Sequence, residues 1–172
     1  MICNRYSITC NCNRLPMSSN LLRPLNAAEL PQLSELEACC FTPPWSDAQL
    51  LSYLSGERYL CYGIWQAERL NGFALLSTVL DEAELLQIGV RPECRGQGLA
   101  SELMHYVHEQ LQRCGVNRNM LEVRSSNDAA RKLYRRLGYQ QDGIRKGYYP
   151  TDNGSEDAIL MSCNNLILLS ER

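Results

Sequence analysis

The chain has 172 residues, a length that fits a single domain able to bury about two thirds of the surface exposed by its unfolded chain. Its formal net charge of -2 and its 45% hydrophobic residues exclude the basic footprint of a nucleic-acid-binding domain and the composition of a disordered chain. Its apolar runs are interrupted well before the ~20 residues that cross a bilayer. We therefore expect a soluble protein without direct nucleic-acid or membrane partners.

The N-terminal residues differ from the rest of the chain. Residues 1–16 hold two arginines and three cysteines but no acidic residue, and they show neither a helical nor a strand period. We expect residues 1–20 to be a disordered extension, with Met17 as the candidate initiator; a transit-like leader is the alternative. These boundaries leave a domain at 21–165 and a tail at 166–172.

Nine cysteines, an odd number, occur without Cys-x-x-Cys spacing and without a secretory segment. This pattern favours a reducing compartment, and we expect the protein in the cytoplasm. The only two histidines, His105 and His108, lie together on one predicted helix, far along the chain from Cys10 and Cys12. Such spacing does not predict a metal site.

The predicted fold begins with two helices. Asn26 and Ser46 precede apolar residues at helical spacing and are candidate N-caps, and the segment Pro-Pro-Trp at 43–45 separates the two predicted helices. Apolar, β-rich runs and two further helices follow. The predicted elements in chain order are helices at 26–40 and 46–54, strands at 59–66, 70–79 and 82–90, a helix at 99–114, a strand at 119–125, a helix at 128–137, and strands at 139–149 and 156–163.

Two glycines, Gly96 and Gly98, stand where the third apolar run gives way to a helix. A helix N-terminus presents free N–H groups and a partial positive charge, so glycine at this point favours phosphate binding. A P-loop is excluded, because Leu99 and Ala100 follow Gly98 where Lys and Ser or Thr are needed. Two other schemes remain.

The first remaining scheme is a dinucleotide fingerprint, for which Glu122 on the next strand would be the acidic residue. It is disfavoured because Ser101 takes the place of the third glycine and no βαβ repetition follows. The second scheme is a pyrophosphate held by the backbone amides of residues 95–101.

Several sequence motifs connect the second scheme with a known protein family. "RGQGLA" at 95–100 matches the Arg/Gln-x-x-Gly-x-Gly/Ala motif of the GNAT acetyltransferases. Together with "PPWSDAQL", "LEVRSSNDAARKLYRRLGY" and "GYYPTDNGSEDAILM", it makes the chain resemble GNAT acetyltransferases of the RimI type from about Leu22 to Cys163.

This resemblance implies an α/β GNAT fold: a mixed, mostly antiparallel twisted sheet flanked by helices, with a splayed central parallel strand pair formed by 85–90 and 119–125. It also implies an acyltransferase that moves an acetyl group from acetyl-CoA, its cosubstrate, to the α-amine of a small-subunit ribosomal protein beginning with alanine. We expect a monomer or weak dimer. Acetylation of a lysine side chain or a small amine, and a non-catalytic acetyl-CoA sensor, remain alternatives.

The resemblance implies two catalytic residues, Glu122 as general base and Tyr134 as general acid. Strand alternation places Glu122 and Arg124 on the same face, so a solvent-facing ion pair with Arg124 is the alternative role for Glu122. Tyr134 lies on an apolar helical stripe, so core packing is the alternative role for it.

The coenzyme-binding residues implied by the resemblance act mainly through their backbones. The Val90 N–H is the hypothesised donor to the thioester carbonyl. Strand packing at Gly89, helix capping by Asn127 and simple solvation of Arg95 are the alternatives. The full set is Ile88, Gly89, Val90, Arg95, Gly96, Gln97, Gly98, Leu99, Ala100, Ser101 and Asn127.

For the acceptor peptide, which the resemblance implies to be basic after its alanine, the sequence offers acids for a rim and aromatic residues for walls. Ordinary solvation of the acids and coverage of the core by the aromatics are the alternatives. The acids are Asp81, Glu82, Glu84, Glu156 and Asp157, and the aromatics are Trp45, Tyr148 and Tyr149.

Overall fold

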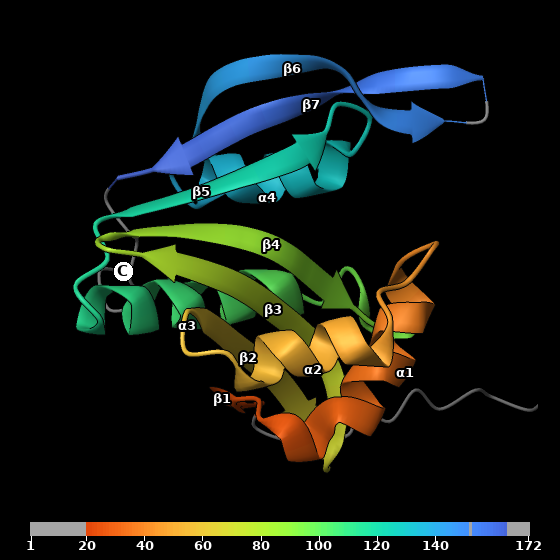
Figure 1. The fold of residues 1–172 in the computed structure, drawn as a ribbon, viewed down its shortest axis with the longest axis vertical. Coiled ribbons are helices and arrows are strands. Elements are labelled where there is room, and N and C mark those ends of the chain that lie inside the picture. Colours follow the sequence, from red (N-terminus) through yellow and green to blue (C-terminus); the bar gives the residue numbers. More distant parts are fainter. Residues whose placement is uncertain (1–19, 152, 165–172) are drawn as a thin grey trace, which may run out of the picture.

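The computed structural model describes residues 20–151 and 153–164, which fold into one sheet with helices on both faces (Figure 1). Seven strands of this part of the chain form the sheet, in the order β1-β2-β3-β4-β5-β7-β6. Met17, the rest of the predicted extension before Asn20, and the predicted tail at 166–172 lie outside the described residues. No helix within the described ranges has the length and apolarity needed to span a membrane.

The helices and strands follow the predicted order after a short first strand. The strands are β1 (Leu21–Pro24), β2 (Tyr59–Gln66), β3 (Arg69–Val79), β4 (Glu82–Val90), β5 (Arg118–Arg124), β6 (Gln140–Thr151) and β7 (Gly154–Cys163). The helices are α1 (Leu30–Cys40), α2 (Asp47–Ser55), α3 (Leu99–Arg113) and α4 (Asp128–Arg136), with 3₁₀ turns at Ala27–Glu29 and Pro92–Cys94.

The predicted helix caps are confirmed. Asn26 Oδ1 accepts the backbone N–H of Ala28 at 2.9 Å, and the side chain of Ser46 caps α2. The prediction of one continuous helix over 26–40 is wrong, since a 3₁₀ turn precedes α1. Pro31 lacks the N–H that a continuous helix would direct to the first turn, and proline is tolerated only where α1 begins.

Two strand predictions need correction. The four-residue β1 was missed because it is too short to show a period of two; it is held by antiparallel pairing with β2 at the edge of the sheet. The last hairpin has a tighter turn than expected, since β6 extends to Thr151 and β7 begins at Gly154. One error concerns a whole short strand and the other concerns strand ends, and in both cases pairing rather than local pattern sets the structure.

The parallel pair β4–β5 creates the opening in the sheet. Its register runs from Glu82↔Arg118 to Leu85↔Leu121 and ends there, although β4 continues to Val90 and β5 to Arg124. A register shift against β3, between Leu75 and Leu76, accompanies this separation. Figure 1 shows the two strands diverging toward their arrowheads. The predicted mixed sheet with a splayed parallel pair is confirmed.

Two apolar layers hold the helices against the sheet. On one face α3 and α4 pack on side chains such as Leu85, Leu121 and Val123. On the other face α1 and α2 pack on a cluster that includes Phe73 and Leu75. The carboxyl ends of β4 and β5 therefore lie between a helix N-terminus on one face and the α1–α2 connection on the other.

Candidate active site

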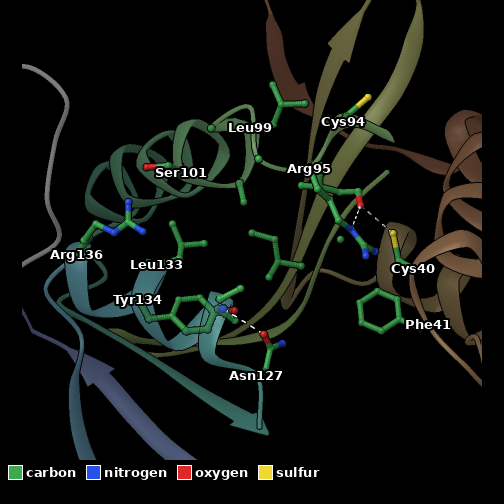
Figure 2. A pocket seen from close by; sticks show the side chains of 18 residues that line it. Cys40, Phe41, Cys94, Arg95, Leu99, Ser101, Asn127, Leu133, Tyr134 and Arg136 are labelled. Atoms are coloured by element: carbon green, nitrogen blue, oxygen red, sulfur yellow. Dashed lines mark hydrogen bonds between the residues drawn. The ribbon is translucent and has the colours of Figure 1, made fainter. Parts of the chain in front are cut away.

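A cavity of about 610 Å³ lies at the splayed end of the sheet (Figure 2). It is bounded by the end of β4, the N-terminus of α3, one side of α4 and the end of α1. Except for Gln97, every residue predicted to contact the coenzyme lines it. The lining residues are Cys40, Phe41, Ile88, Gly89, Val90, Cys94, Arg95, Gly96, Gly98, Leu99, Ala100, Ser101, Asn127, Ala129, Ala130, Leu133, Tyr134 and Arg136.

The glycines before α3 have a backbone conformation that other residues rarely adopt. Gly96 and Gly98 have φ of 75° and 87°, in the left-handed region. A Cβ on either glycine would meet no atom of the residues that the structure describes within 4 Å, so conformation rather than crowding by these residues requires glycine. Gly98 occupies the N-cap position of α3 and provides no side-chain cap. The amides of the first turn are therefore available to an anion.

Two side chains of the same loop bind the protein itself. Arg95 Nε donates to the carbonyl of Val90 at 3.0 Å, which fixes the loop to the end of β4. Gln97 Nε2 donates to the carbonyl of Glu93 at 3.3 Å, and its side chain does not line the cavity. These bonds leave the backbone of the loop as the cavity wall.

Gly89 serves packing as well as forming part of the cavity wall. An added Cβ would lie 2.6 Å from Phe73 Cε1 and 3.1 Å from Cys40 Sγ. The structure therefore supports the packing requirement at this position. Because a side chain cannot fit there, the backbone of β4 between Ile88 and Val90 remains open to the cavity.

Tyr134 both packs in the core and lines the cavity. Its side chain is 5% exposed, and its ring lies 5.6 Å from that of Tyr139, centroid to centroid. Burial is the main cause that raises the pKa of Tyr134 well above its ordinary value. The phenol is consequently protonated at neutral pH and is a donor. Asn127, at the start of the same helix, caps it by accepting the N–H of Ala130 at 3.1 Å.

Glu122 lies on the other side of β5 and is not among the residues that line the cavity. Its neighbours Leu121 and Val123 are buried toward α3 and α4, which places Glu122 on the face of α1 and α2. Its ionic partner is Arg145 of β6, with 3.0 Å between Nη1 and Oε1. The alternative pairing with Arg124 is wrong, because Arg124 binds Glu156 at 2.6 Å.

The predicted acidic rim does not form as one surface. Asp81, Glu82 and Glu84 lie beside the first residues of β5, whereas Glu156 and Asp157 lie beside its end. The seven residues of β5 separate the two groups by about 20 Å. Glu156 and Asp157 are also engaged in ion pairs, with Arg124 and Lys146 respectively.

The predicted aromatic walls occupy two segments. Trp45 lies in the α1–α2 connection and stacks on Tyr53 at a centroid distance of 4.8 Å. Tyr148 and Tyr149 lie on β6; Tyr148 is 47% exposed, and the guanidinium of Arg124 covers the ring of Tyr149 at 4.4 Å. These aromatic residues lie on the same side of the splayed strands as Glu122.

Some lining residues were not predicted from the sequence. Cys40 and Phe41 come from the end of α1, and Arg136 comes from the last turn of α4. Figure 2 shows Arg136 on the same side of the cavity as Ser101. The sequence motifs assigned them no role, because they reach the cavity only through helix packing. Among the described residues, no cluster of three or more His, Cys, Asp or Glu is arranged to hold a metal ion.

Comparison with known proteins gives matches along most of the chain. A family model described as "Acetyltransferase (GNAT) family" matches residues 30–139. The [ribosomal protein bS18]-alanine N-acetyltransferase of Escherichia coli (strain K12) is 40% identical over 143 residues, 83% of this chain and 96% of that protein. The putative [ribosomal protein bS18]-alanine N-acetyltransferase of Bacillus subtilis (strain 168) is 36% identical over 141 residues, 81% of this chain and 92% of that protein.

A solved structure agrees with the sequence matches. The crystal structure of the ribosomal-protein-S18-alanine N-acetyltransferase from Escherichia coli has a TM-score of 0.81 and 37% identity, over 90% of this chain and 99% of that chain. The family match includes every residue that lines the cavity. The chain belongs to the GNAT family of acetyl-CoA-dependent N-acetyltransferases.

Proposed function

We propose that this enzyme acetylates the N-terminal α-amine of a ribosomal protein that begins with alanine, of the bS18 type, in the cytoplasm where ribosomal proteins are made. The observation that carries the proposal is the 40% identity to a [ribosomal protein bS18]-alanine N-acetyltransferase over 96% of that protein's length. The cavity at the splayed strands supplies a place for the donor.

The donor follows the cavity wall from α3 to β4. The pyrophosphate of acetyl-CoA binds the amides of the first turn of α3, after Gly98, where the helix dipole favours negative charge. The pantetheine arm lies along Ile88, Gly89 and Val90, whose backbone is open to the cavity. The thioester carbonyl then accepts the Val90 N–H, which stabilises the oxyanion formed on attack.

Arg136 is expected to bind a phosphate of the coenzyme. Replacing Arg136 with Ala should raise the KM for acetyl-CoA several-fold at low salt, and the difference should shrink with added salt as the charge is screened. Steady-state kinetics at two ionic strengths measures this. Arg135→Ala is the matched control, since Arg135 does not line the cavity; an equal effect of both changes would contradict a specific phosphate contact.

Acetyl transfer requires a neutral amine and a protonated leaving group. An α-amine has an ordinary pKa near 8, so Glu122 needs only to accept one proton from it, directly or through a water molecule. The amine nitrogen forms a bond to the thioester carbon, and the carbon–sulfur bond breaks. The phenol of Tyr134 donates a proton to the departing thiolate. Because the amine attacks the thioester directly, no acyl-enzyme forms.

Tyr134→Phe separates acid catalysis from packing. The ring and its core contacts remain, so the melting temperature should change little, whereas kcat should fall about 10²-fold with an unchanged KM for acetyl-CoA. Tyr139→Phe is the matched control: it removes the acceptor of Asn119 Nδ2 at 2.7 Å and should lower stability rather than kcat. A Tyr134→Phe enzyme with full kcat would leave Tyr134 only its packing role.

The class of acceptor is tested by competition. We expect kcat/KM for a peptide beginning with Ala-Arg to exceed that for a polyamine or an aminoglycoside by at least about 10²-fold, a difference of about 2.7 kcal/mol in transition-state binding. Steady-state assays that follow release of free coenzyme A measure all three acceptors. Preference for the polyamine or the aminoglycoside would contradict the proposed acceptor while leaving acetyl transfer intact.

A further inference from the structure

A buried carboxyl group joins α1 to β4 and to the α1–α2 connection. The Glu37 side chain is 0% exposed. Its Oε1 accepts the backbone N–H of Trp45 at 3.0 Å and Nε2 of Gln87 at 3.0 Å. Gln87 directly precedes Ile88, the first residue of β4 that lines the cavity. One side chain therefore links three segments beside the cavity.

Two oxygen atoms of this linked pair receive no hydrogen bond from the described residues. Glu37 Oε2 and Gln87 Oε1 are both buried, and neither has a partner within 20–151 or 153–164. Buried acceptors without donors are rare in folded proteins because each has lost its hydrogen bonds to water. Gln87 Oε1 belongs to the amide that already binds the same carboxyl group through Nε2, so a proton on Glu37 Oε2 is the donor that would satisfy both atoms.

The surroundings of Glu37 favour the neutral acid. Removal of the carboxyl group from water raises the pKa of Glu37 above 4.5, although the hydrogen bonds from Trp45 and Gln87 oppose this effect. Glu37 takes part in none of the ion pairs formed by the described residues. Without a cationic partner, only these two hydrogen bonds offset the cost of burying its negative charge.

Other charged groups near α1 are engaged elsewhere or exposed. Glu35 pairs with Arg91 at 2.9 Å, and Arg95 bonds the Val90 carbonyl. The titratable and charged groups on α1 and on the elements packed against it are Glu29, Glu35, Cys39, Cys40, Asp47, Tyr53, Arg69, Glu82 and Glu84, with Arg91 and Arg95 following β4.

We propose that Glu37 is a neutral carboxylic acid at pH 7 and that it forms a two-bond pair with the amide of Gln87, which positions the bulged part of β4 against α1. Glu37 is a positioning residue: it does not line the cavity and acts through the strand that leads to Ile88 and Gly89. The register shift at Leu75 and Leu76 interrupts the β3–β4 ladder here, so a side-chain pair supplies the missing constraint. The inference holds for any acceptor amine.

Infrared spectroscopy observes the proton directly. The difference spectrum between the unaltered protein and Glu37→Gln at pH 7 should contain the carbonyl band of a protonated carboxylic acid, and that band should shift in D₂O. Glu35→Gln is the matched control, because Glu35 is exposed and ion-paired on the same helix. A spectrum that shows only an ionised carboxylate lost from position 37 would overturn the proposal.

The pH dependence of stability provides a second readout. Because the pKa of Glu37 is raised in the folded state, the contribution of Glu37 to the free energy of unfolding is largest below its unfolded pKa of 4.5. This contribution decreases as the pH rises, until Glu37 ionises in the folded protein. Glu37→Gln cannot ionise, so its stability relative to the unaltered protein should increase steadily from pH 4.5 and still be increasing at pH 7. A difference that levels off below pH 7 places the folded pKa below neutrality and contradicts the proposal.

Steady-state kinetics distinguish a positioning role of Glu37 from a requirement for its negative charge. A Gln side chain at position 37 has one acceptor oxygen and an uncharged NH2 donor group in place of the O–H of the neutral acid, so Glu37→Gln should keep kcat and the KM for acetyl-CoA within about twofold. Glu37→Ala leaves the Trp45 N–H and Gln87 unpaired and should lower kcat/KM about tenfold. An equal loss in both variants would show that the negative charge is needed, against the proposal, and the infrared result stands even if Glu37→Ala does not fold.

Discussion

Replacement of Glu122 with Gln is expected to lower kcat at least about 10²-fold and to leave the dissociation constant for acetyl-CoA within about twofold. Gln has nearly the same volume as Glu but cannot accept the proton of the attacking amine. The donor should bind normally, because Glu122 lies across β5 from the cavity that receives it. Steady-state kinetics and isothermal calorimetry measure the two quantities separately.

The control for this change is Glu84→Gln, which removes an exposed carboxylate from the neighbouring strand β4. It should leave kcat unaltered. The ion pair with Arg145 adds a second check, since Arg145 remains without its partner in Glu122→Gln and the melting temperature must be recorded. A loss of acetyl-CoA affinity as large as the loss of kcat would contradict the assignment of Glu122 as the base.

Replacement of Gly98 with Ala should weaken acetyl-CoA binding about tenfold or more. A residue with a Cβ is strained at φ 87° by about 1–2 kcal/mol, and relief of the strain turns the first amides of α3 away from the cavity. Since 1.4 kcal/mol is a factor of ten in affinity, the strain alone accounts for a loss of this size. Calorimetry with acetyl-CoA measures it.

Gln97→Ala is the matched control at the neighbouring position. Gln97 has an ordinary backbone, and its side chain binds the carbonyl of Glu93 outside the cavity. Acetyl-CoA affinity should therefore change less than about threefold, in keeping with the loss of a single exposed hydrogen bond. If the two variants bound acetyl-CoA equally well, the backbone of this loop would not be the phosphate site.

Local signals in the sequence were sufficient for most elements. Asn26, Ser46 and Asn127 cap helices as expected, because a capping side chain acts within three residues of its own position. β2 and β4 have the predicted bounds because their apolar runs end at polar turns. Where a boundary depends on a partner far along the chain, as for β1 against β2, the sequence alone did not predict it.

Only those parts of the candidate site that are contiguous in the sequence could be predicted from it. The loop with Gly96 and Gly98 and the end of β4 carry recognisable motifs, and they do line the cavity. The contribution of Phe41 depends on how α1 packs against β4, and the partner of Glu122 depends on where β6 passes β5. Strand alternation correctly placed Arg124 on the face of Glu122, yet it could not show that Glu156 holds Arg124 instead.

The central claim is that the enzyme acetylates an N-terminal α-amine. Its most direct test is mass spectrometry of two peptides that begin Ala-Arg and carry an internal lysine, one with a free α-amine and one with that amine blocked, after incubation with enzyme and acetyl-CoA. We predict one added acetyl group on the free peptide, located at its N-terminus by fragmentation, and none on the blocked peptide. Acetylation of the blocked peptide at lysine, or of neither peptide, would contradict the claim.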